Sequence, residues 1–339
     1  LGDKLRARAI AEDAGVALVP GTGSIADVPS AKEAAENIGY PVVMKASAGG
    51  GGRGMFIAHN ANDLAASFEK SSNEAQEAFG DGTLYMERFV GNARHVEVQV
   101  LGDGKGRVIH FGERDCSTQR RYQKIVEEAP CAIMPGEVRE KLHQAAVKLL
   151  SKLNYRNAGT VEFLYDVDAQ DIYFIEVNTR IQVEHPVSEQ VTGADLVQLQ
   201  FKVAGLETVD FNQAQVNLNR HAIECRINAE DAANDFMPCP GRIVAWRPPR
   251  GAGVRIDSHC RDGYLVPPQY DSMIGKLIVT ANDRDSAVER LSAALDQFEI
   301  EGITTNLPIL RHIVRHADFK ANKISTRWLE QTVLPEFQN

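Results

Sequence analysis

Two alternating runs, TVEFLYD at 160–166 and IYFIEVN at 172–178, constrain the fold more than any other feature of the chain. Joined by the short segment VDAQD, they predict an antiparallel hairpin centred on Ala169, in which Glu162 faces Glu176. Like charges directly opposite each other destabilise a strand pair, so this pairing predicts a cation between the two carboxylates. Glu162, Glu176 and Asn178 offer the hard oxygen ligands that suit Mg²⁺ or Mn²⁺.

The alternation continues past the hairpin in EVNTRIQVEH, at 176–185. Side chains of an extended chain alternate between two sides, so one side would carry polar groups and the other mainly apolar ones. A half-buried strand with a solvated outer face would produce the same pattern, but the facing glutamates favour a binding site. The polar side consists of Glu176, Asn178, Arg180, Gln182 and Glu184.

The stretch KASAGGGGRGM, at 45–55, places a glycine-rich loop directly after Lys45. Glycine backbone N–H groups can converge on a phosphate because no Cβ hinders them. A dinucleotide fingerprint would need a helix within the motif, and a Walker-A loop would need its lysine after the glycines; the chain offers neither. A flexible surface turn is the alternative, but a phosphate flap and a hard-metal hairpin in one chain together predict MgATP.

The composition indicates a folded protein of two or three packed units rather than a nucleic-acid or membrane protein. Its 339 residues include 37 basic and 46 acidic side chains, for a net charge of −9. No apolar run approaches the roughly 20 residues of a membrane helix and no signal peptide opens the chain, so we expect an intracellular protein. The five cysteines lack any CxxC spacing, which predicts reduced thiols rather than disulfides or a zinc site.

Short antiparallel strands interleaved with helices predict an α+β fold rather than a doubly wound parallel sheet. We expect a first helix over 1–17, a small α+β unit over 18–90, a mainly antiparallel unit over 91–212, a strand-rich unit over 213–330 and a tail over 331–339. Residues 20–23 read as a loop. Expected helices include 30–38, 61–70, 136–153, 189–204, 284–297 and 305–316, and expected strands include 40–47, 54–58 and 83–89.

Two further segments carry charged residues whose role the pattern leaves open. RDCSTQRRYQKIVEEAP gathers a local cationic patch in an acidic chain, which would suit an ATP site or simply be solvated. In HAIECRIN, Glu224 and Arg226 share one face of a strand, so Arg226 either binds an anion or pairs with Glu224. The patch consists of Arg114, Arg120, Arg121 and Lys124, with Gln119.

Eight segments, in order along essentially the whole chain, match the motifs of one known family. They are GDK at 2–4, KASAGGGGRGM at 45–55, YMERF at 85–89, RHVEVQV at 94–100, ERDCSTQRRYQKIVEEAP at 113–130, FIEVNTRIQVEHPVSE at 174–189, ECRINAED at 224–231 and YDSMIGKL at 270–277. Together they resemble biotin carboxylase, the ATP-grasp component of biotin-dependent carboxylases such as acetyl-CoA, propionyl-CoA and pyruvate carboxylases. The resemblance implies an α+β ATP-grasp fold, with a lid over 18–90 and a catalytic subdomain over 91–212, followed by a biotin carboxylase C-terminal domain over 213–330.

The resemblance also implies a reaction. MgATP and bicarbonate form carboxyphosphate, which yields CO₂ for the carboxylation of biotin, with ADP and phosphate as products. The implied cofactors are ATP and two Mg²⁺ or Mn²⁺ ions, with carrier-bound biotin as substrate. The implied partners are a biotin carboxyl carrier, a carboxyltransferase and a second copy in a homodimer, with no nucleic acid and no membrane. We expect a cytoplasmic location, or the mitochondrial matrix in a eukaryote.

Individual residues receive roles by resemblance alone. Glu184 corresponds to the base that deprotonates bicarbonate, and Arg226 to the residue that stabilises the biotin enolate. The bicarbonate pocket corresponds to Lys124, Arg180, Gln182, Val183 and Glu184, and the catalytic residues to Lys124, Arg180, Glu184 and Arg226. The ATP contacts correspond to Lys4 and Lys45 at the phosphates, Gly50 and Gly51 in the lid, Glu87, Arg88 and Val90 at the adenine, His95 and Gln119 near the nucleotide, and the metal ligands Glu162 and Glu176.

The chain departs from the family's pattern in three ways. Tyr122 stands where bacterial members have a histidine near the ribose, and Arg88 where many have lysine. The family also begins with a further α/β domain that is absent here, so the fragment alone need not be active. A carbamoyl phosphate synthetase half and a noncatalytic nucleotide-binding module are the alternatives, and the first typically has a serine-rich stretch where this chain has IQVEHPVSE.

Overall fold

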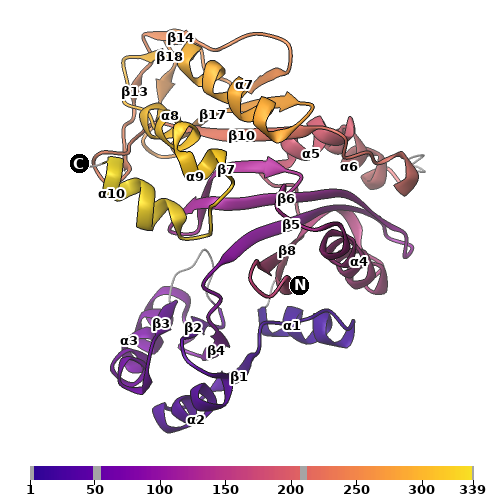
Figure 1. Ribbon diagram of the computed structural model, residues 1–339, viewed down its shortest axis with the longest axis vertical. Coiled ribbons are helices and arrows are strands. Elements are labelled where there is room, and N and C mark those ends of the chain that lie inside the picture. Colours follow the sequence, from indigo (N-terminus) through magenta and orange to yellow (C-terminus); the bar gives the residue numbers. More distant parts are fainter. Residues whose placement is uncertain (1–3, 49–54, 207–211, 338–339) are drawn as a thin grey trace.

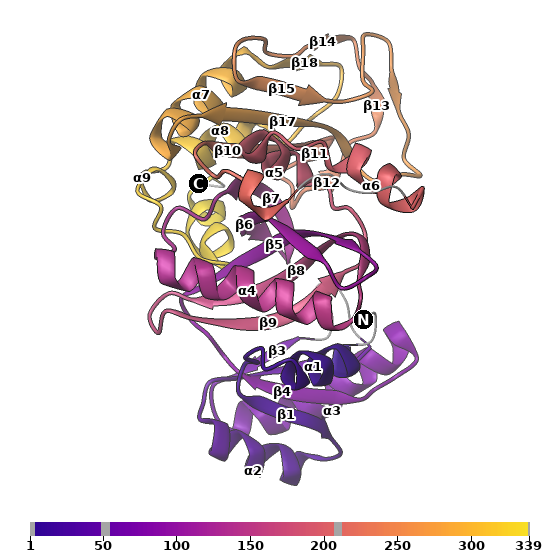
Figure 2. The ribbon, with the colours of Figure 1, turned by 90° about the vertical axis from the view of Figure 1, so that its right-hand side faces the viewer.

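The chain forms a small N-terminal lobe, a large central sheet and a C-terminal layer of helices and short strands (Figure 1). The structure is a computed structural model that describes residues 4–48, 55–206 and 212–337. Helix α1 (Lys4–Asp13) lies between the lobe and the central sheet (Figure 2). Its buried Ala7 and Ala11 share an apolar cluster with Phe163 and Phe174 of the sheet, which fixes the start of the chain against the sheet.

Four strands and two helices build the lobe. The strands form an antiparallel sheet in the order β1-β4-β2-β3. Both helices contribute buried residues to the lobe's own apolar core, so the lobe is a packed unit that presents Lys45 from its second strand. The elements are β1 (Gly21–Ile25), α2 (Val28–Ile38), β2 (Val42–Ala46), β3 (Phe56–Ala58), α3 (Ala61–Phe79) and β4 (Leu84–Arg88).

Eight strands form the central sheet, in the order β15-β17-β10-β7-β6-β5-β8-β9, and all neighbours are antiparallel. The sheet crosses the boundary expected near residue 212, because β10 pairs with β7. The domain boundaries themselves stay a prediction. The strands are β5 (Ala93–Asp103), β6 (Val108–Arg120), β7 (Gln123–Ala129), β8 (Arg156–Asp166), β9 (Asp171–Asn178), β10 (His221–Asn228), β15 (Val254–Asp257) and β17 (Met273–Ala281).

Alternation along the strands gives the sheet one apolar and one charged face. On β5, Val96 and Val98 belong to the buried cluster beneath α4 (Gly136–Lys152), so Glu97 between them points to the opposite face. That face is charged and yet buried, which is tolerable only where opposite charges and hydrogen bonds compensate the lost hydration. The predicted site residue Glu162, which lies opposite Glu97 on β8, shares this face.

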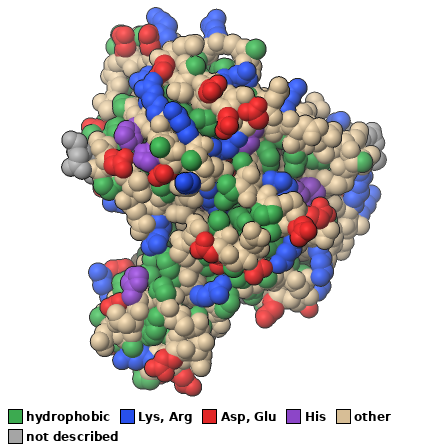
Figure 3. All heavy atoms as spheres, in the orientation of Figure 1, with side chains coloured by type: hydrophobic (Ala, Val, Ile, Leu, Met, Phe, Trp, Pro, Cys, Tyr) green, Lys and Arg blue, Asp and Glu red, His purple; other side chains and the backbone are tan. Residues whose placement is uncertain are grey.

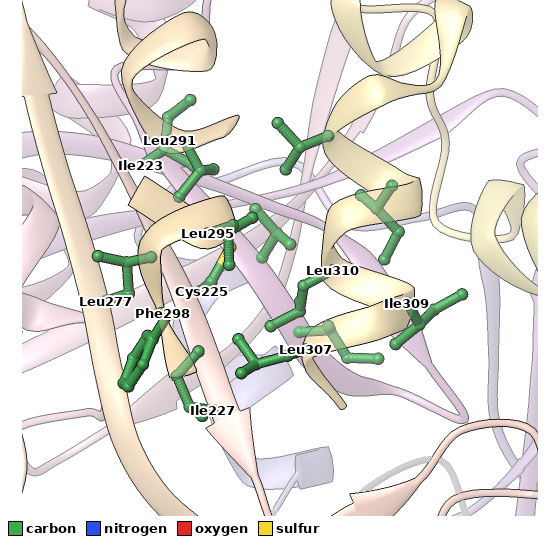
Figure 4. Packing of buried hydrophobic residues seen from close by; sticks show 14 of the residues in the cluster. Ile223, Cys225, Ile227, Leu277, Leu291, Leu295, Phe298, Leu307, Ile309 and Leu310 are labelled. Carbon is green, nitrogen blue, oxygen red and sulfur yellow. The ribbon is translucent and has the colours of Figure 1, made fainter. Parts of the chain in front are cut away.

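Helices α7 (Arg284–Gln297) and α8 (Leu307–Arg315) pack on the other half of the sheet against β10 (Figure 4). Ile223 points into this apolar cluster, so Glu224 and Arg226 point away from it. The layer is completed by η1 (Gln213–Gln215), β11 (Glu230–Asp231), β12 (Met237–Pro238), β13 (Gly241–Arg242), β14 (Ala245–Arg247), β16 (Leu265–Val266), β18 (Glu299–Glu301), α9 (Ala317–Lys320), η2 (Leu329–Val333) and α10 (Leu334–Phe337).

Two helical expectations need correction, while those near 30–38, 136–153, 284–297 and 305–316 are confirmed. Helix α3 runs to Phe79 rather than ending near 70, because the small residues Ser71 and Ala75 continue its buried stripe. The helix expected over 189–204 is two helices, α5 (His185–Thr192) and α6 (Leu196–Ala204). Gly193 ends the first of them in a left-handed conformation with φ of 74°, which glycine adopts without strain.

Strand β1 replaces a segment that was expected to be a loop. Of residues 20–23, the last three begin β1, where pairing with β4 outweighs the low strand propensity of glycine. The second half of the cationic patch is strand β7, which forms a hairpin with β6. Its turn residues Arg121 and Tyr122 both have positive φ, a conformation usually signalled by Gly or Asn, so the sequence gives no warning of this turn.

All five cysteines lie among the described residues and are free thiols. Cys116, Cys131 and Cys225 are buried, and the other two are partly exposed. Over the described parts of the chain, none of the helices combines the length and the apolar character that crossing a membrane requires.

The core shown in Figure 4 makes a prediction about stability. Leu295 is fully buried, so we expect Leu295→Ala to lower the free energy of unfolding by about 2–5 kcal/mol, through lost burial and the cavity left behind. Leu265→Ala is the matched control: this side chain is 57% exposed, and its loss should change the free energy by less than about 0.5 kcal/mol. Urea unfolding measures both, and equal losses would contradict this description of the core.

Candidate functional site

A row of charged residues crosses four neighbouring strands of the central sheet. Glu97 on β5 lies opposite Arg114 on β6 and opposite Glu162 on β8, which in turn lies opposite Glu176 on β9. The predicted pairing of Glu162 with Glu176 is confirmed. Three carboxylates in one row require cations nearby, because like charges facing each other across a strand pair repel.

The hairpin pairs Glu162 with Glu176 as expected, but nearer the turn its register is shifted by one residue. Phe163 lies opposite Phe174, whereas a hairpin centred on Ala169 would place it opposite Ile175. A β-bulge after Glu162 accounts for the difference, because it adds one residue to one strand. The expected hairpin centre at Ala169 is therefore wrong for the residues between the bulge and the turn.

The carboxylate of Glu162 accepts hydrogen bonds from two amide side chains, one of which is the predicted metal ligand Asn178. Asn178 Nδ2 donates to Glu162 Oε1 over 2.8 Å, and Gln182 Nε2 donates to the same oxygen over 3.0 Å. His95 Nε2 lies 3.1 Å from Glu162 Oε2; burial lowers the pKa of His95, but the charge of Glu162 outweighs burial and raises it. The predicted ligands Glu162, Glu176 and the amide oxygen of Asn178 would offer only oxygen donors, which fits Mg²⁺ or Mn²⁺.

Lys124 brings a positive charge to the row from β7. Its Nζ lies 2.5 Å from Glu97 Oε2, 2.5 Å from Glu184 Oε1 and 3.4 Å from Glu162 Oε1. Burial lowers the pKa of Lys124, but the surrounding acidic groups outweigh burial and hold the pKa well above its ordinary value. Burial likewise raises the pKa of Glu97, but Lys124 and Arg114 outweigh it and lower the pKa to about 2.

Arg114 is the fully buried centre of the same network. Its Nε donates to Glu97 Oε1 over 2.6 Å, and its Nη2 donates to Gln182 Oε1 over 3.2 Å. A buried guanidinium with acceptors for its N–H groups is rigid, so Arg114 fixes both side chains. The further acceptors of its hydrogen bonds are Gln99, Thr160 and Ser188.

The expected cationic patch is therefore not one surface. Arg114 and Lys124 point into the site, whereas Arg120 and Arg121 pair with the exposed Asp235. The split follows from the β6–β7 hairpin, whose strands carry Arg114 and Lys124 into the sheet and whose end carries the other two arginines outward. Neither a purely solvated run nor a single cationic patch describes this segment.

Glu184 reaches the site by a route that differs from the expectation. Strand β9 ends before this residue, so the chain there is not extended; Glu184 instead directly precedes α5. Its Oε1 accepts from Lys124, and its Oε2 accepts from Arg226 Nη2 over 3.0 Å. Arg226 Nε also donates to Glu127 Oε1 over 2.6 Å, so the arginine pairs with these two carboxylates and not with Glu224.

Three predicted site residues lie outside this cluster of side chains. Arg180 is exposed, and its Nη1 donates to the carbonyl of Ile181. Val183 takes part through its carbonyl, which accepts from Lys276 Nζ over 2.7 Å. Gln119 is buried, and its Oε1 has no hydrogen-bond partner among the described residues.

The lobe carries the predicted phosphate contact Lys45. Its ammonium pairs with the buried Glu87, which also pairs with Arg8 of α1. Burial raises the pKa of Tyr85, and the charges of Glu87 and Glu176 raise it further. Figure 3 shows the surface hollowed between the lobe and the rest of the molecule.

Two predicted adenine contacts lie where the lobe meets the sheet. Arg88 Nη2 donates to Tyr173 Oη over 2.8 Å, and Val90 is buried. The hydrogen bond between Arg88 and Tyr173 therefore joins the end of β4 in the lobe to β9 of the central sheet. The predicted contacts that lie outside the described parts of the chain are the side chain of Lys4, Gly50 and Gly51.

Two family descriptions divide the chain between them. Residues 3–211 match "Carbamoyl-phosphate synthase L chain, ATP binding domain", and residues 224–331 match "Biotin carboxylase C-terminal domain". Biotin carboxylase 1 of Bacillus subtilis is 47% identical over 331 residues, which are 97% of this chain and 74% of that protein. The chain belongs to the biotin carboxylase family. It is thereby an ATP-grasp protein and an ATP-dependent ligase, and the alternative of a carbamoyl phosphate synthetase half is rejected.

Solved biotin carboxylases agree with this fold over nearly the whole chain. A biotin carboxylase from Campylobacter jejuni, described as a β,γ-ATP complex, has a TM-score of 0.93 at 47% identity and covers 98% of this chain and 74% of its own. The biotin carboxylase domain dimer of Hydrogenobacter thermophilus 2-oxoglutarate carboxylase, in complex with MgADP, ADP and bicarbonate, has a TM-score of 0.93 at 46% identity and covers 100% and 74%.

Two residues of this network, Glu97 and Glu127, are not among the site residues predicted from the sequence, and Arg114 is predicted only as part of the cationic patch. Glu97 carries the same signal that revealed Glu176, because RHVEVQV alternates polar residues with valines. Arg114 is visible only as one member of a charged run. Glu127 is one of two successive glutamates, and only the register of β7 with β10 shows that it accompanies Arg226.

The pKa of Glu97 predicts a specific pH dependence of stability. A carboxyl whose pKa falls from 4.5 to about 2 on folding stabilises the protein above pH 4.5, and this contribution disappears as the pH falls toward 2. We expect the free energy of unfolding to decrease by about 3 kcal/mol more in the wild type than in Glu97→Gln over this range. Urea unfolding at several pH values measures the two slopes, and parallel slopes would contradict the assignment.

Proposed function

We propose that this chain catalyses the MgATP-dependent carboxylation of biotin by bicarbonate, the first half-reaction of a biotin-dependent carboxylase. The observation that carries the proposal is the position of Glu184 between Lys124 and Arg226, beside the metal ligand Glu162. A carboxylate held between two cations next to a hard-cation site suits an anionic substrate that must lose a proton and attack a phosphate. The ligands named for the two solved relatives, a β,γ-ATP complex in one and MgADP with bicarbonate in the other, support the same substrates.

The nucleotide would lie between the lobe and the sheet, with its phosphates near Lys45. Glu162, Glu176 and Asn178 would hold two Mg²⁺ or Mn²⁺ ions, which neutralise phosphate charge during transfer. Lys45 would exchange its contact with Glu87 for a contact with the phosphates. The phosphates would then supply the anionic partner that an ammonium needs in a partly buried site. The remaining proposed nucleotide contacts are Lys4, Gly50, Gly51, Glu87, Arg88, Val90, His95 and Gln119.

Bicarbonate would lie against Lys124, with Arg180, Gln182 and Val183 as its other contacts. Glu184 would take its proton, and the freed oxygen would attack the γ-phosphorus as ADP leaves, which gives carboxyphosphate. Because Lys124 stays protonated at neutral pH, it would remain a cation beside this anion throughout. Arg180 is exposed, so its role requires that its side chain turn toward the bound anion.

Biotin would be carboxylated on the side of Arg226. Carboxyphosphate would break down to CO₂ and phosphate, the released phosphate would take the proton from biotin N1, and that nitrogen would bond to the carbon of CO₂. Arg226 would donate hydrogen bonds to the enolate oxygen that forms on biotin, an electrostatic role that needs a guanidinium fixed in place. Glu127 and Glu184 fix it from two sides.

We propose the partners of a biotin-dependent carboxylase for this chain. A biotin carboxyl carrier would present biotin, and a carboxyltransferase would select the final acceptor, an acyl-CoA or a keto acid. A homodimer is also proposed, supported by the domain dimer named for the Hydrogenobacter thermophilus relative. We propose a cytoplasmic location, or the mitochondrial matrix in a eukaryote.

The proposed activity can be tested by ATP hydrolysis in the full-length protein. We expect hydrolysis that depends on bicarbonate and is stimulated by free biotin, because bicarbonate is the attacking group and biotin consumes the CO₂. Hydrolysis that ignores both compounds would reject the proposal and favour a different ATP-grasp reaction. MgATP binding without turnover would favour the noncatalytic nucleotide-binding module.

Glu184→Gln separates the base from the nucleotide site. We expect this variant to bind MgATP with unchanged affinity but to lose bicarbonate-dependent turnover by about 100-fold or more, because the amide cannot take a proton. The matched control is Glu140→Gln on the exposed face of α4, which should alter neither property. Calorimetric binding and ATP hydrolysis give the two readouts, and a parallel loss of both would show that Glu184 has a structural role.

A further inference from the structure

Two buried glutamates lie directly opposite each other behind Arg226. Glu127 on β7 pairs with Glu224 on β10, and the exposed fraction of each residue is 0%. Residues opposite each other in an antiparallel pair lie on one face, with Cβ atoms about 5 Å apart. Two ionised carboxylates in this arrangement would repel each other in surroundings that water does not screen.

Three of the four carboxylate oxygens of this pair have no hydrogen-bond partner among the described residues. Glu127 Oε1 accepts from Arg226 Nε over 2.6 Å, but Glu127 Oε2 has no hydrogen-bond partner among the described residues. Both oxygens of Glu224 are also without a partner there. Buried polar atoms are almost always hydrogen-bonded, so three unsatisfied oxygens on two facing residues indicate a hydrogen-bond donor that two ionised carboxylates cannot supply.

The charges that face the pair leave no cation for Glu224. Arg226, on the same strand, already lies between Glu127 and Glu184. Lys276, opposite Arg226 on β17, donates to the carbonyl of Val183 and lies 3.7 Å from Asp257. Burial raises the pKa of Glu224 well above its ordinary value, and the charge of Glu127 adds to this effect. A neutral Glu224 agrees with all of these contacts.

We propose that Glu224 is a protonated carboxylic acid whose O–H donates to Glu127 Oε2, and that it is thereby a positioning residue for Arg226. A proton on Glu224 makes this side chain a hydrogen-bond donor, and the unsatisfied oxygen of Glu127 then has a partner. The hydrogen bond stabilises Glu127 as the anion, and the anion holds the guanidinium through its Nε. Its consequence for catalysis rests on the proposed function, in which Arg226 meets the biotin enolate.

The surrounding packing keeps this arrangement fixed. The neighbours of Glu224 along β10, Ile223 and Cys225, are locked in the apolar core with α7 and α8 (Figure 4). On the carboxylate side, Ala222 of β10 and Ile278 of β17 pack against Val187 and Val191 of α5. Both glutamates are fully buried between these layers, so bulk water does not reach their carboxyl groups.

Infrared difference spectroscopy tests the protonation directly. We expect the wild type at neutral pH to show the C=O stretching band of a protonated carboxylic acid, and Glu224→Gln to lack it. This variant keeps the size of the side chain, so the comparison does not depend on a disruptive change. An unchanged carboxylic acid band in Glu224→Gln would overturn the proposal.

Two variants of Glu224 test the positioning role. We expect Glu224→Gln to retain most biotin-stimulated ATP hydrolysis, because its amide N–H can still donate to Glu127. We expect Glu224→Met, which has no donor, to lose it about tenfold. Ile278→Met is the packing control, since Ile278 on β17 lies opposite Glu224 on β10 and is 1% exposed. Equal losses in Glu224→Gln and Glu224→Met would overturn the proposal.

The outcomes separate this proposal from the proposed function. A wild type that hydrolyses ATP without regard to biotin and bicarbonate would reject the carboxylase activity, while the infrared band would still decide the protonation of Glu224. An active wild type whose spectrum is unchanged by Glu224→Gln would reject the shared proton and leave the carboxylase activity standing.

Discussion

The row formed by Arg114, Glu97, Glu162 and Glu176 is the constraint on which the rest of the site depends. Register places three carboxylates side by side on a buried sheet face, and such a row is stable only if cations are built around it. Arg114 and Lys124 supply two of these cations from β6 and β7. The proposed metal ligands Glu162 and Glu176 lie at the other end of the row, where a divalent cation would add further positive charge.

The same cations connect parts of the chain that are distant in sequence. Arg114 donates to Gln182 and to Ser188, which ties the segment before α5 and the first turn of that helix to the sheet. Glu184, between these two residues, is thereby held between Lys124 and Arg226. The pairing of β7 with β10 brings Arg226 from the C-terminal layer to this point. One continuous sheet thus joins the part that matches the ATP-binding family to the part that matches the biotin carboxylase C-terminal family.

The sequence predicts a feature well when the residues that determine the feature are close together in the chain. The facing of Glu162 and Glu176 follows from a short hairpin, and the period of two suffices to find it even though a bulge shifts the turn. The route to Glu184 is not predictable in this way, because the chain leaves β9 and turns into α5. The separation of Lys124 from Arg121 depends on a turn with positive φ at Arg121 and Tyr122, for which neither residue type is a signal. Strand order is the least local property, and without it the contact of Glu97 with Glu162 is invisible.

The contacts of Lys124 are unequal, and the inequality decides which of them a bound cation would disturb. Two of its three carboxylate contacts are 2.5 Å long, and the third, to the proposed metal ligand Glu162, is 3.4 Å. The longest contact contributes least, so a cation bound at Glu162 would displace it with the smallest loss of stabilisation. Lys124 would keep Glu97 and Glu184 as partners, so the ammonium would stay fixed beside the segment that precedes α5.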